Sequence, residues 1–200
     1  TIKNHKRIIF NGNGYDDSWV KEAESRGLLN LKTTPDALPY FKTEENIELF
    51  ERQKVLSKEE VQSRYEILMD EYEKQINIEA LTMLDIAKKD ILPAASKFSK
   101  ELTDTIANKK AIGIDLTYEL ETAKKVSEYL TEAYQALITL EKDVEKLHNI
   151  DDFEKSAFYV RDFIIQDMAA LRKPCDKLEV VTSNEDWPFP TYGKLLFGIL

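Results

Sequence analysis

Gly12 and Gly14 form the motif of this chain that most resembles a phosphate-binding loop. They follow the apolar residues Ile8–Phe10 and precede a segment with helical character. A dinucleotide-binding loop needs a third glycine, and its position holds Asp17. No Gly-Lys-Ser/Thr motif of a P-loop occurs either. Asp16 and Asp17 would also repel a phosphate at a helix N-terminus. The pattern therefore favours a tight turn with left-handed glycines.

Two pairs of potential metal ligands have spacings found in metal sites. Glu22 and Glu24 lie two residues apart, so on a helix they point about 200° away from each other and cannot share a cation. Glu145 and His148 have the i, i+3 spacing of di-metal helical bundles. Such a site needs a second pair, and the only other histidine is His5. We expect both pairs to be solvated, and we predict no metal ligands.

Cys175 is the single cysteine and the remaining candidate nucleophile. Lys173 and Lys177 lie nearby in sequence and are expected to lower its pKa a little. No histidine is near it in sequence, and no G-x-S-x-G motif occurs. The sequence therefore predicts no catalytic, cofactor-binding or metal-binding residue in this chain.

The N-terminal segment is expected to be irregular, with short helices. Arg7–Phe10 suits a short strand or an extended lead-in. Residues 16–18 are N-cap types, and Gly27 stands where a left-handed residue ends a helix. Thr34 is expected to cap a second helix with proline at its first position, and Pro39 is expected to interrupt that helix within about a turn.

Three long periodic runs follow. Ser57 and Glu60 form a capping box before the first, and Pro93 is expected to kink that helix without ending it. Residues 108–113 suit a turn, and the second helix should begin near Asp115. Its apolar residues alternate spacings of four and three, which predicts a buried heptad seam. The seam comprises Val126, Leu130, Ala133, Leu137, Leu140, Val144 and Leu147.

The third run starts at another expected capping box, Asp151 to Glu154. Its periodic residues are Phe153, Ala157, Val160, Ile164, Leu171 and Leu178. Asp167 occupies one seam position, and Pro174 is expected to interrupt the helix. The aromatic and proline-rich tail 187–197 is expected to be extended and to fold back on residues 1–56. The predicted fold is all-α: a long antiparallel helical hairpin or bundle with a small irregular N-terminal part.

Composition and charge narrow the function classes. The 200 residues are 42% hydrophobic and 32% charged, a globular composition with room for a sizeable core. The net charge of −9 lies in residues 57–200, and such acidity disfavours nucleic acid and anionic lipid as partners. The longest apolar run is far too short for a membrane span, no signal peptide is visible, and one cysteine suits a reducing cytoplasm.

Three stretches together resemble the C-terminal part of type III glutamine synthetase. The resemblance covers His5 to about Ala95 and Trp187–Phe197, and its most distinctive parts are Asn11–Tyr15 and Asn77–Met83. Residues 96–185 add mainly helical character. The resemblance implies that residues 1–42 end the catalytic region and that residues 43–200 form a C-terminal helical domain.

The same resemblance implies what the longer protein does. Members of the family condense glutamate and ammonia, use ATP and Mg2+ or Mn2+, and form homo-oligomers, expected to be dodecamers. Their catalytic, nucleotide and metal-binding residues lie upstream of the region that this chain resembles. The chain alone is therefore expected to be inactive, to pack on the catalytic domain of its own chain, and to support oligomer assembly or regulation.

Two other readings of the sequence stay open. The chain could be a free-standing helical protein–protein interaction module that uses the heptad seam to bind a partner. An independent small enzyme is the third reading, and the missing catalytic constellations disfavour it. The first reading expects a glutamine synthetase core upstream of Thr1.

Overall fold

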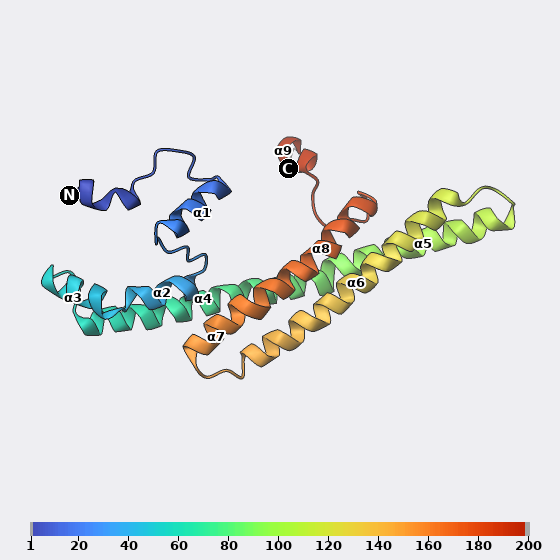
Figure 1. The fold of residues 1–200 in the computed structure, drawn as a ribbon. Coiled ribbons are helices and arrows are strands. Elements are labelled where there is room, and N and C mark those ends of the chain that lie inside the picture. Colours follow the sequence, from blue (N-terminus) through green and yellow to red (C-terminus); the bar gives the residue numbers. More distant parts are fainter. Residues whose placement is uncertain (1, 199–200) are drawn as a thin grey trace. The chain divides into compact units, whose positions relative to one another are not determined.

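The computed structural model describes residues 2–198, with the side chain of Tyr192 left out. Throughout this range the regular structure is helical, as predicted (Figure 1). The contacts divide the chain into two compact units, one ending at Leu68 and the other starting at Met69. The boundary falls inside helix α4 (Lys58–Ile86). Each unit is described by itself below.

The first unit begins with a 3-10 helix, η1 (Ile2–Ile8), followed by α1 (Asp17–Ser25). The prediction of a strand or extended lead-in at Arg7–Phe10 is wrong for Arg7 and Ile8. The reason is local: the Ile9 N–H donates to the Lys6 carbonyl at 3.1 Å, so this turn satisfies a backbone group that a lone strand would leave unpaired.

Helix α1 has the predicted caps. The Asp16 side chain accepts a hydrogen bond from the Ser18 N–H at 2.8 Å, and Gly27 has a φ of 72°. Gly12 and Gly14, however, are not left-handed, which corrects the predicted turn. A Cβ at Gly12 would lie 2.5 Å from the ring of Phe10, so a larger residue there would require this ring to shift.

Helices α2 (Thr34–Phe41) and α3 (Glu44–Arg52) contact each other, and the rings of Phe41 and Phe50 lie 5.5 Å apart. The cap of α2 is Thr33, one residue before the predicted Thr34. Pro39 lies inside α2 and does not interrupt it. Two α4 residues of this unit, Val61 and Tyr65, are fully buried, and the Lys42 ammonium lies 3.6 Å from the centroid of the Tyr65 ring.

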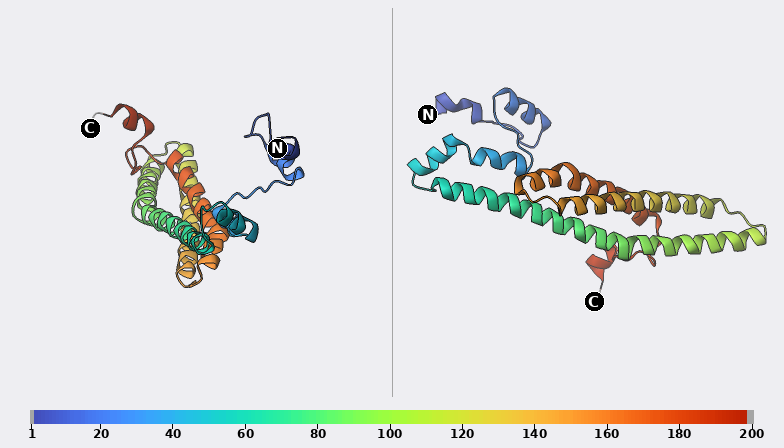
Figure 2. Two further views of the ribbon diagram at one scale, coloured as in Figure 1. Left: turned by 90° about the vertical axis from the view of Figure 1, so that its left-hand side faces the viewer. Right: turned by 90° about the horizontal axis from the view of Figure 1, so that it is seen from below.

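Helix α4 spans the boundary between the units, and two further helical elements follow it directly in the sequence. They are the π-helical turn η2 (Ala87–Ile91) and α5 (Leu92–Ala111) (Figure 2). The capping box is confirmed: the Ser57 N–H donates to Glu60 at 2.7 Å, and the Glu60 N–H donates to the Ser57 hydroxyl at 3.2 Å. Helix continues through Pro93, as predicted.

The second unit folds back twice. Gly113, with a φ of 69°, lies in the turn between α5 and α6 (Thr117–Leu147). Helix α7 (Phe153–Tyr159), the π-helical turn η3 (Val160–Ile164) and α8 (Ile165–Val181) then return along α6. The cap of α7 is Asp152, one residue after the predicted Asp151. Pro174 does not interrupt α8: it lies buried inside it, so tertiary packing outweighs the lost backbone hydrogen bond.

The core of the second unit confirms the predicted seam. Six of the seven seam residues of α6 are buried, and Leu130 packs against them. From the returning helices, Ala157, Val160, Ile164, Leu171 and Leu178 are also buried. The core residues of α4, η2 and α5 are Ala80, Leu84, Ala87, Ala95 and Leu102. The predicted antiparallel bundle therefore buries most of the residues that the periodicity selected in α6 and the returning helices, while Leu130 and Phe153 are partly buried.

The tail after α8 packs on its own unit. Trp187 lies against the core of the helical bundle, and its ring meets that of Phe189 edge to face at 6.2 Å. The expectation that the aromatic tail folds back on residues 1–56 is wrong for Trp187, since the bundle core offers it an apolar surface. The last described helix is α9 (Tyr192–Phe197), which replaces part of the expected extended tail.

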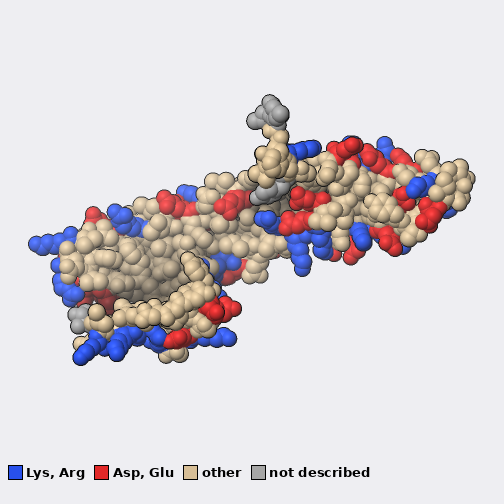
Figure 3. Space-filling model, turned by 90° about the horizontal axis from the view of Figure 1, so that it is seen from above, with Lys and Arg blue, Asp and Glu red and all other residues tan. Residues whose placement is uncertain are grey.

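The surface of the second unit carries charged side chains of both signs. On the face seen in Figure 3, acidic and basic side chains are interspersed among uncharged ones. Between residues 2 and 198, no helix combines the length and apolar character required to cross a bilayer.

Candidate functional site

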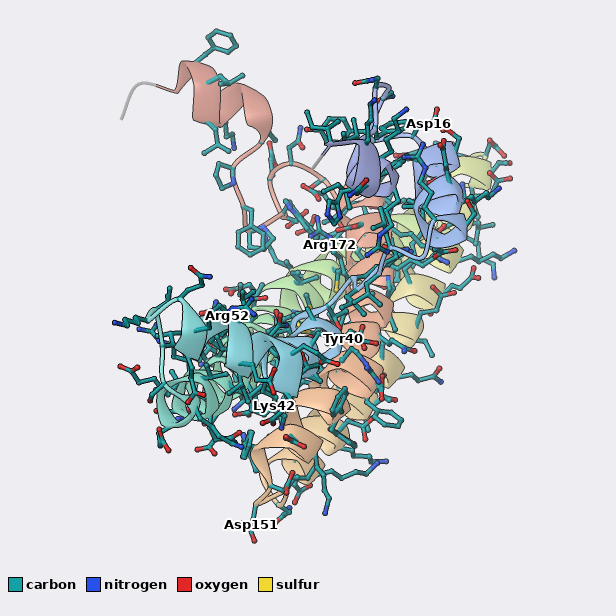
Figure 4. The ribbon with its side chains drawn as sticks, turned by 60° about the vertical axis from the view of Figure 1, so that its left-hand side comes forward. Asp16, Tyr40, Lys42, Arg52, Asp151 and Arg172 are labelled. Atoms are coloured by element: carbon teal, nitrogen blue, oxygen red, sulfur yellow. The ribbon has the colours of Figure 1, made fainter. Side chains whose placement is uncertain are left out.

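The loop at Gly12 and Gly14 is arranged for packing and not for phosphate. The ring of Phe10 stacks on Trp19 at 4.0 Å, and the Arg26 guanidinium lies 5.4 Å from the centroid of the Trp19 ring. Asp16 lies at the start of α1 (Figure 4), and its carboxylate accepts a hydrogen bond from the Ser18 N–H. An anion bound at this helix N-terminus would need the same N–H group. The loop therefore contributes an aromatic contact to the first unit.

The two carboxylates of the Glu22–Glu24 pair bind different partners. Glu22 forms an ion pair with Arg26, while Glu24 accepts a hydrogen bond from Asn30 at 3.3 Å. Among residues 2–198, no three His, Cys, Asp or Glu side chains are grouped so that they could hold a metal ion.

His148 caps α6 and links it to α4. Its Nε2 atom lies 3.2 Å from Nδ2 of Asn77, whose Oδ1 is buried and has no hydrogen-bond partner in the described part of the chain. Burial, with the negative charge of Asp70, raises the pKa of Glu73 on α4. The Glu145–His148 pair thus lies at a helix–helix contact, which the sequence pattern alone did not reveal.

Cys175 is buried in α8, and the expectation of a lowered thiol pKa is wrong. Burial raises the pKa of the Cys175 thiol to about 11, and the neighbouring Asp176 carboxylate adds to the effect. Lys177, which was expected to help, instead donates to Glu132 of α6 at 2.8 Å. At neutral pH the thiol is protonated, so it is a poor nucleophile.

A groove of about 520 Å³ runs between the α4–η2 segment and α8. Its apolar lining comes from Ile78, Met83, Ile86, Ile91, Met168 and Leu171. The polar residues Glu79, Arg172 and Asp176 also line it, and Arg172 donates to Asp176 at 3.3 Å (Figure 4 labels Arg172 on α8). The groove is suited to apolar groups and has no arrangement of catalytic groups.

A polar cluster joins α6 and α7. One carboxylate oxygen of Asp143, Oδ1, accepts from Lys146 Nζ at 2.6 Å and from the Tyr159 hydroxyl at 3.0 Å. The Oδ2 atom of Asp167 on α8 is buried and has no hydrogen-bond partner among the described residues, and burial raises the pKa of Asp167 to about 6. Sequence reasoning singled out Asp167 as a polar residue on an apolar seam but did not reveal these surroundings.

Over residues 2–198, fold and site together define a helical bundle domain in which no catalytic centre is recognisable. The family described as "Glutamine synthetase C-terminal domain" matches residues 1–110. The chain is 39% identical to a glutamine synthetase of Butyrivibrio fibrisolvens over 201 residues, which cover 100% of the chain and 29% of that relative. It is 33% identical to a type-3 glutamine synthetase of Dictyostelium discoideum over 98% of the chain and 28% of the relative.

A glutamine synthetase of Bacteroides fragilis is 26% identical over 95% of the chain and 27% of its own length. The chain belongs to the glutamine synthetase C-terminal domain family, which confirms the resemblance seen in the sequence. It spans less than a third of the length of these curated relatives.

Proposed function

We propose that this chain is the C-terminal, non-catalytic part of a type III glutamine synthetase. Residues 1–42 would end the catalytic region, and residues 43–200 would form a helical domain that packs on the catalytic body. The observation that carries the proposal is the match over nearly the whole chain to enzymes more than three times as long. The whole enzyme would condense glutamate and ammonia with ATP in the cytoplasm.

The described residues do not fit the metal and nucleotide that such an enzyme uses. They contain no group of three metal ligands, and Asp16 already binds the N–H of Ser18 at the helix that follows the glycines. We therefore assign no catalytic step to this chain. ATP and Mg2+ or Mn2+ would bind to residues upstream of it.

The activity part of the proposal is tested with the chain alone. Purified chain is assayed for γ-glutamyl transferase and biosynthetic activity with Mg2+ or Mn2+, beside the full-length protein as a positive control. We expect turnover from the full-length protein and none above the blank from the chain. Activity of the chain alone would contradict the proposal.

A second part of the proposal is that the helical domain supports a homo-oligomer, expected to be a dodecamer. The Lys109–Glu119 ion pair connects α5 and α6 close to the turn that joins them. The end of the hairpin that contains this turn can be removed without removing the buried residues Leu102 and Val126. In full-length protein, residues 104–124 are replaced by a short Gly-Asn-Gly loop. We expect sedimentation to show smaller assemblies than wild type.

Unchanged assembly and unchanged activity in that variant would refute a role of the hairpin end in assembly. The alternative function is a free-standing helical interaction module. Its predicted binding surface, the heptad seam, is buried in the core, so the groove between α4 and α8 would take that role. This alternative predicts that the gene encodes no glutamine synthetase core upstream of Thr1, so sequencing that region separates the two.

A further inference from the structure

His148, the C-cap residue of α6, is joined to Asn77 of α4 by one polar contact. Its Nε2 atom lies 3.2 Å from Nδ2 of Asn77. An amide nitrogen only donates hydrogen bonds, so Nε2 of the ring must be the acceptor. A protonated imidazole carries a hydrogen on both ring nitrogens and has no acceptor left. The contact therefore needs a neutral ring whose proton lies on Nδ1.

The Asn77 amide is poorly placed to reverse for a charged ring. Its Oδ1 atom is buried and has no hydrogen-bond partner in the described part of the chain. A turn of the amide by 180° would move both Nδ2 hydrogens to that buried side. The present orientation buries one acceptor there, whereas the reversed orientation would bury two donors. We therefore expect the amide to keep its nitrogen toward the ring.

A carboxylate on the same helix offers the charged ring a different partner. Glu145 lies one turn before His148, and both line a pocket of about 330 Å³ between α4, η2 and α6. Side chains three residues apart on a helix are neighbours. Glu145 is exposed, and its carboxylate has no ion-pair partner among residues 2–198. The other charged side chains of the pocket already form ion pairs, namely Lys88–Glu141 and Asp85–Lys89.

Glu73 is the further carboxylate near this contact, one turn before Asn77 on α4. Burial, with the charge of Asp70, raises the pKa of Glu73, while the charges of Lys74 and His148 oppose this effect. Lys74 itself forms an ion pair of 2.6 Å with Asp70. Glu73 therefore gains its proton at a higher pH than an ordinary glutamate, so its titration has to be separated from that of His148.

We propose that protonation of His148 breaks its contact with Asn77 and moves the ring to Glu145. The neutral ring accepts from the amide of α4, and the charged ring donates to the carboxylate of α6. Histidine is the side chain that ordinarily changes its charge between about pH 5 and 8. In acid, the C-terminal end of α6 thus loses a polar contact with α4. This inference is independent of the proposed function.

The neutral state is tested by nitrogen nuclear magnetic resonance of the imidazole rings in the wild-type 200-residue chain. His5 is the only other histidine and serves as an internal comparison. At a pH above the titration of both rings, we expect His148 to carry its proton on Nδ1 and none on Nε2. A proton on Nε2 under these conditions would overturn the proposal, because Nε2 could not then accept from Asn77.

The exchange of partners is tested by the titration of His148 in two variants. Asn77→Ala removes the partner of the neutral ring, so the ring should bind its proton about twofold or more tightly than in wild type. Glu145→Gln removes the partner of the charged ring, so the ring should bind its proton about twofold more weakly. The opposite signs of the two effects identify which form of the ring each residue binds.

Two further variants are controls. Gln75→Ala lies on α4 at an exposed position, where the Gln75 side chain donates to Glu79 at 2.9 Å, and it should leave the titration of His148 unchanged. Glu73→Gln removes the second titrating group. The effect of Asn77→Ala should persist when it is combined with Glu73→Gln.

Three outcomes would contradict the proposal. Proton binding that is unchanged or weaker in Asn77→Ala would show that the charged ring also binds Asn77, through a reversed amide. Loss of the Asn77→Ala effect in the Glu73→Gln background would assign the pH dependence to Glu73. Unchanged proton binding in Glu145→Gln would show that the charged ring does not move to Glu145.

Discussion

Lys97 of α5 binds Asp186, the residue immediately before Trp187, through an ion pair of 2.8 Å. The Asp186 side chain is only 4% exposed, and it also accepts a hydrogen bond from the Ser183 hydroxyl at 2.5 Å. The Lys97 hydrogen bond is the main reason that the pKa of Asp186 is lowered. This contact holds the start of the tail against α5 and so positions Trp187 on the bundle core.

We predict that Asp186→Asn releases the tail. The variant loses the charge-assisted hydrogen bond to Lys97, so Trp187 should become more exposed and its fluorescence should shift to longer wavelength. Trp19→Phe serves as the background, since Trp19 and Trp187 are the only tryptophans. Glu185→Gln, one residue earlier, is the control. An unchanged emission maximum in Asp186→Asn would show that the ion pair does not position the tail.

The same ion pair predicts a pH dependence. Because the pKa of Asp186 is lowered in the folded chain, its contribution is present above the ordinary 3.8 and is lost as the pH falls below that value. Trp187 fluorescence in the Trp19→Phe background should therefore shift to longer wavelength only in strong acid. A shift of the same size between pH 7 and 5 would contradict this assignment.

Leu137→Ala should destabilise the second unit. Leu137 is 3% exposed in the α6 seam, so truncation removes buried area and leaves a cavity, at a cost of about 2–5 kcal/mol. Leu120→Ala, on the same helix but 40% exposed, is the matched control and should cost much less. Urea unfolding followed by circular dichroism measures both. Equal losses in the two variants would contradict a buried seam.

Ser57→Ala should weaken the start of α4. The variant loses the hydroxyl that accepts from the Glu60 N–H, and a lost N-cap costs about 0.5–2 kcal/mol. Ser63→Ala, at an exposed position inside α4, should be neutral or slightly stabilising, because alanine has the higher helix propensity. Thermal unfolding compares the two. A loss in Ser63→Ala as large as in Ser57→Ala would argue against the capping box.

Cys175 should react slowly with thiol reagents in the folded chain. Raising the thiol pKa from 9.0 to about 11 lowers the thiolate fraction at pH 8 by about 100-fold, and burial slows access further. The rate of colour development with a disulfide reagent measures this. The chain in denaturant is the control and should react fast. Similar rates in both states would show that Cys175 is accessible.

Periodicity predicted the long helices and their buried faces well. The α6 seam from Val126 to Leu147 repeats so regularly that one face must be apolar, and local side chains such as Ser57 and Glu60 then determine where a helix starts. These signals lie within a few residues of each other. They therefore need no knowledge of the rest of the fold.

Other predictions were wrong because the structure there depends on distant contacts. Pro174 interrupts a helix by local rules, but packing keeps it inside α8. Tyr159 of α7 donates to Asp143 of α6, and nothing in the spacing of either residue identifies the other. Trp187 was assigned to the wrong surface for the same reason. For Asp167, the sequence signal was an acid on an apolar seam. Such an acid indicates a buried polar group but does not identify the residues around it.

The π-helical turns η2 and η3 interrupt otherwise continuous helices, and they differ in whether a regular α-helical turn can take their place. In η2 the N–H of Leu92 donates to the Ala87 carbonyl, five residues back, directly before Pro93. An α-helical turn there would press the Pro93 ring against the Lys89 carbonyl, so the wider turn makes room for the proline. In η3 the N–H of Ile165 donates to Val160, and no proline follows within four residues. A protein that lost one residue in η3 could close into a regular helix, whereas the same loss in η2 would be tolerated only together with the loss of Pro93.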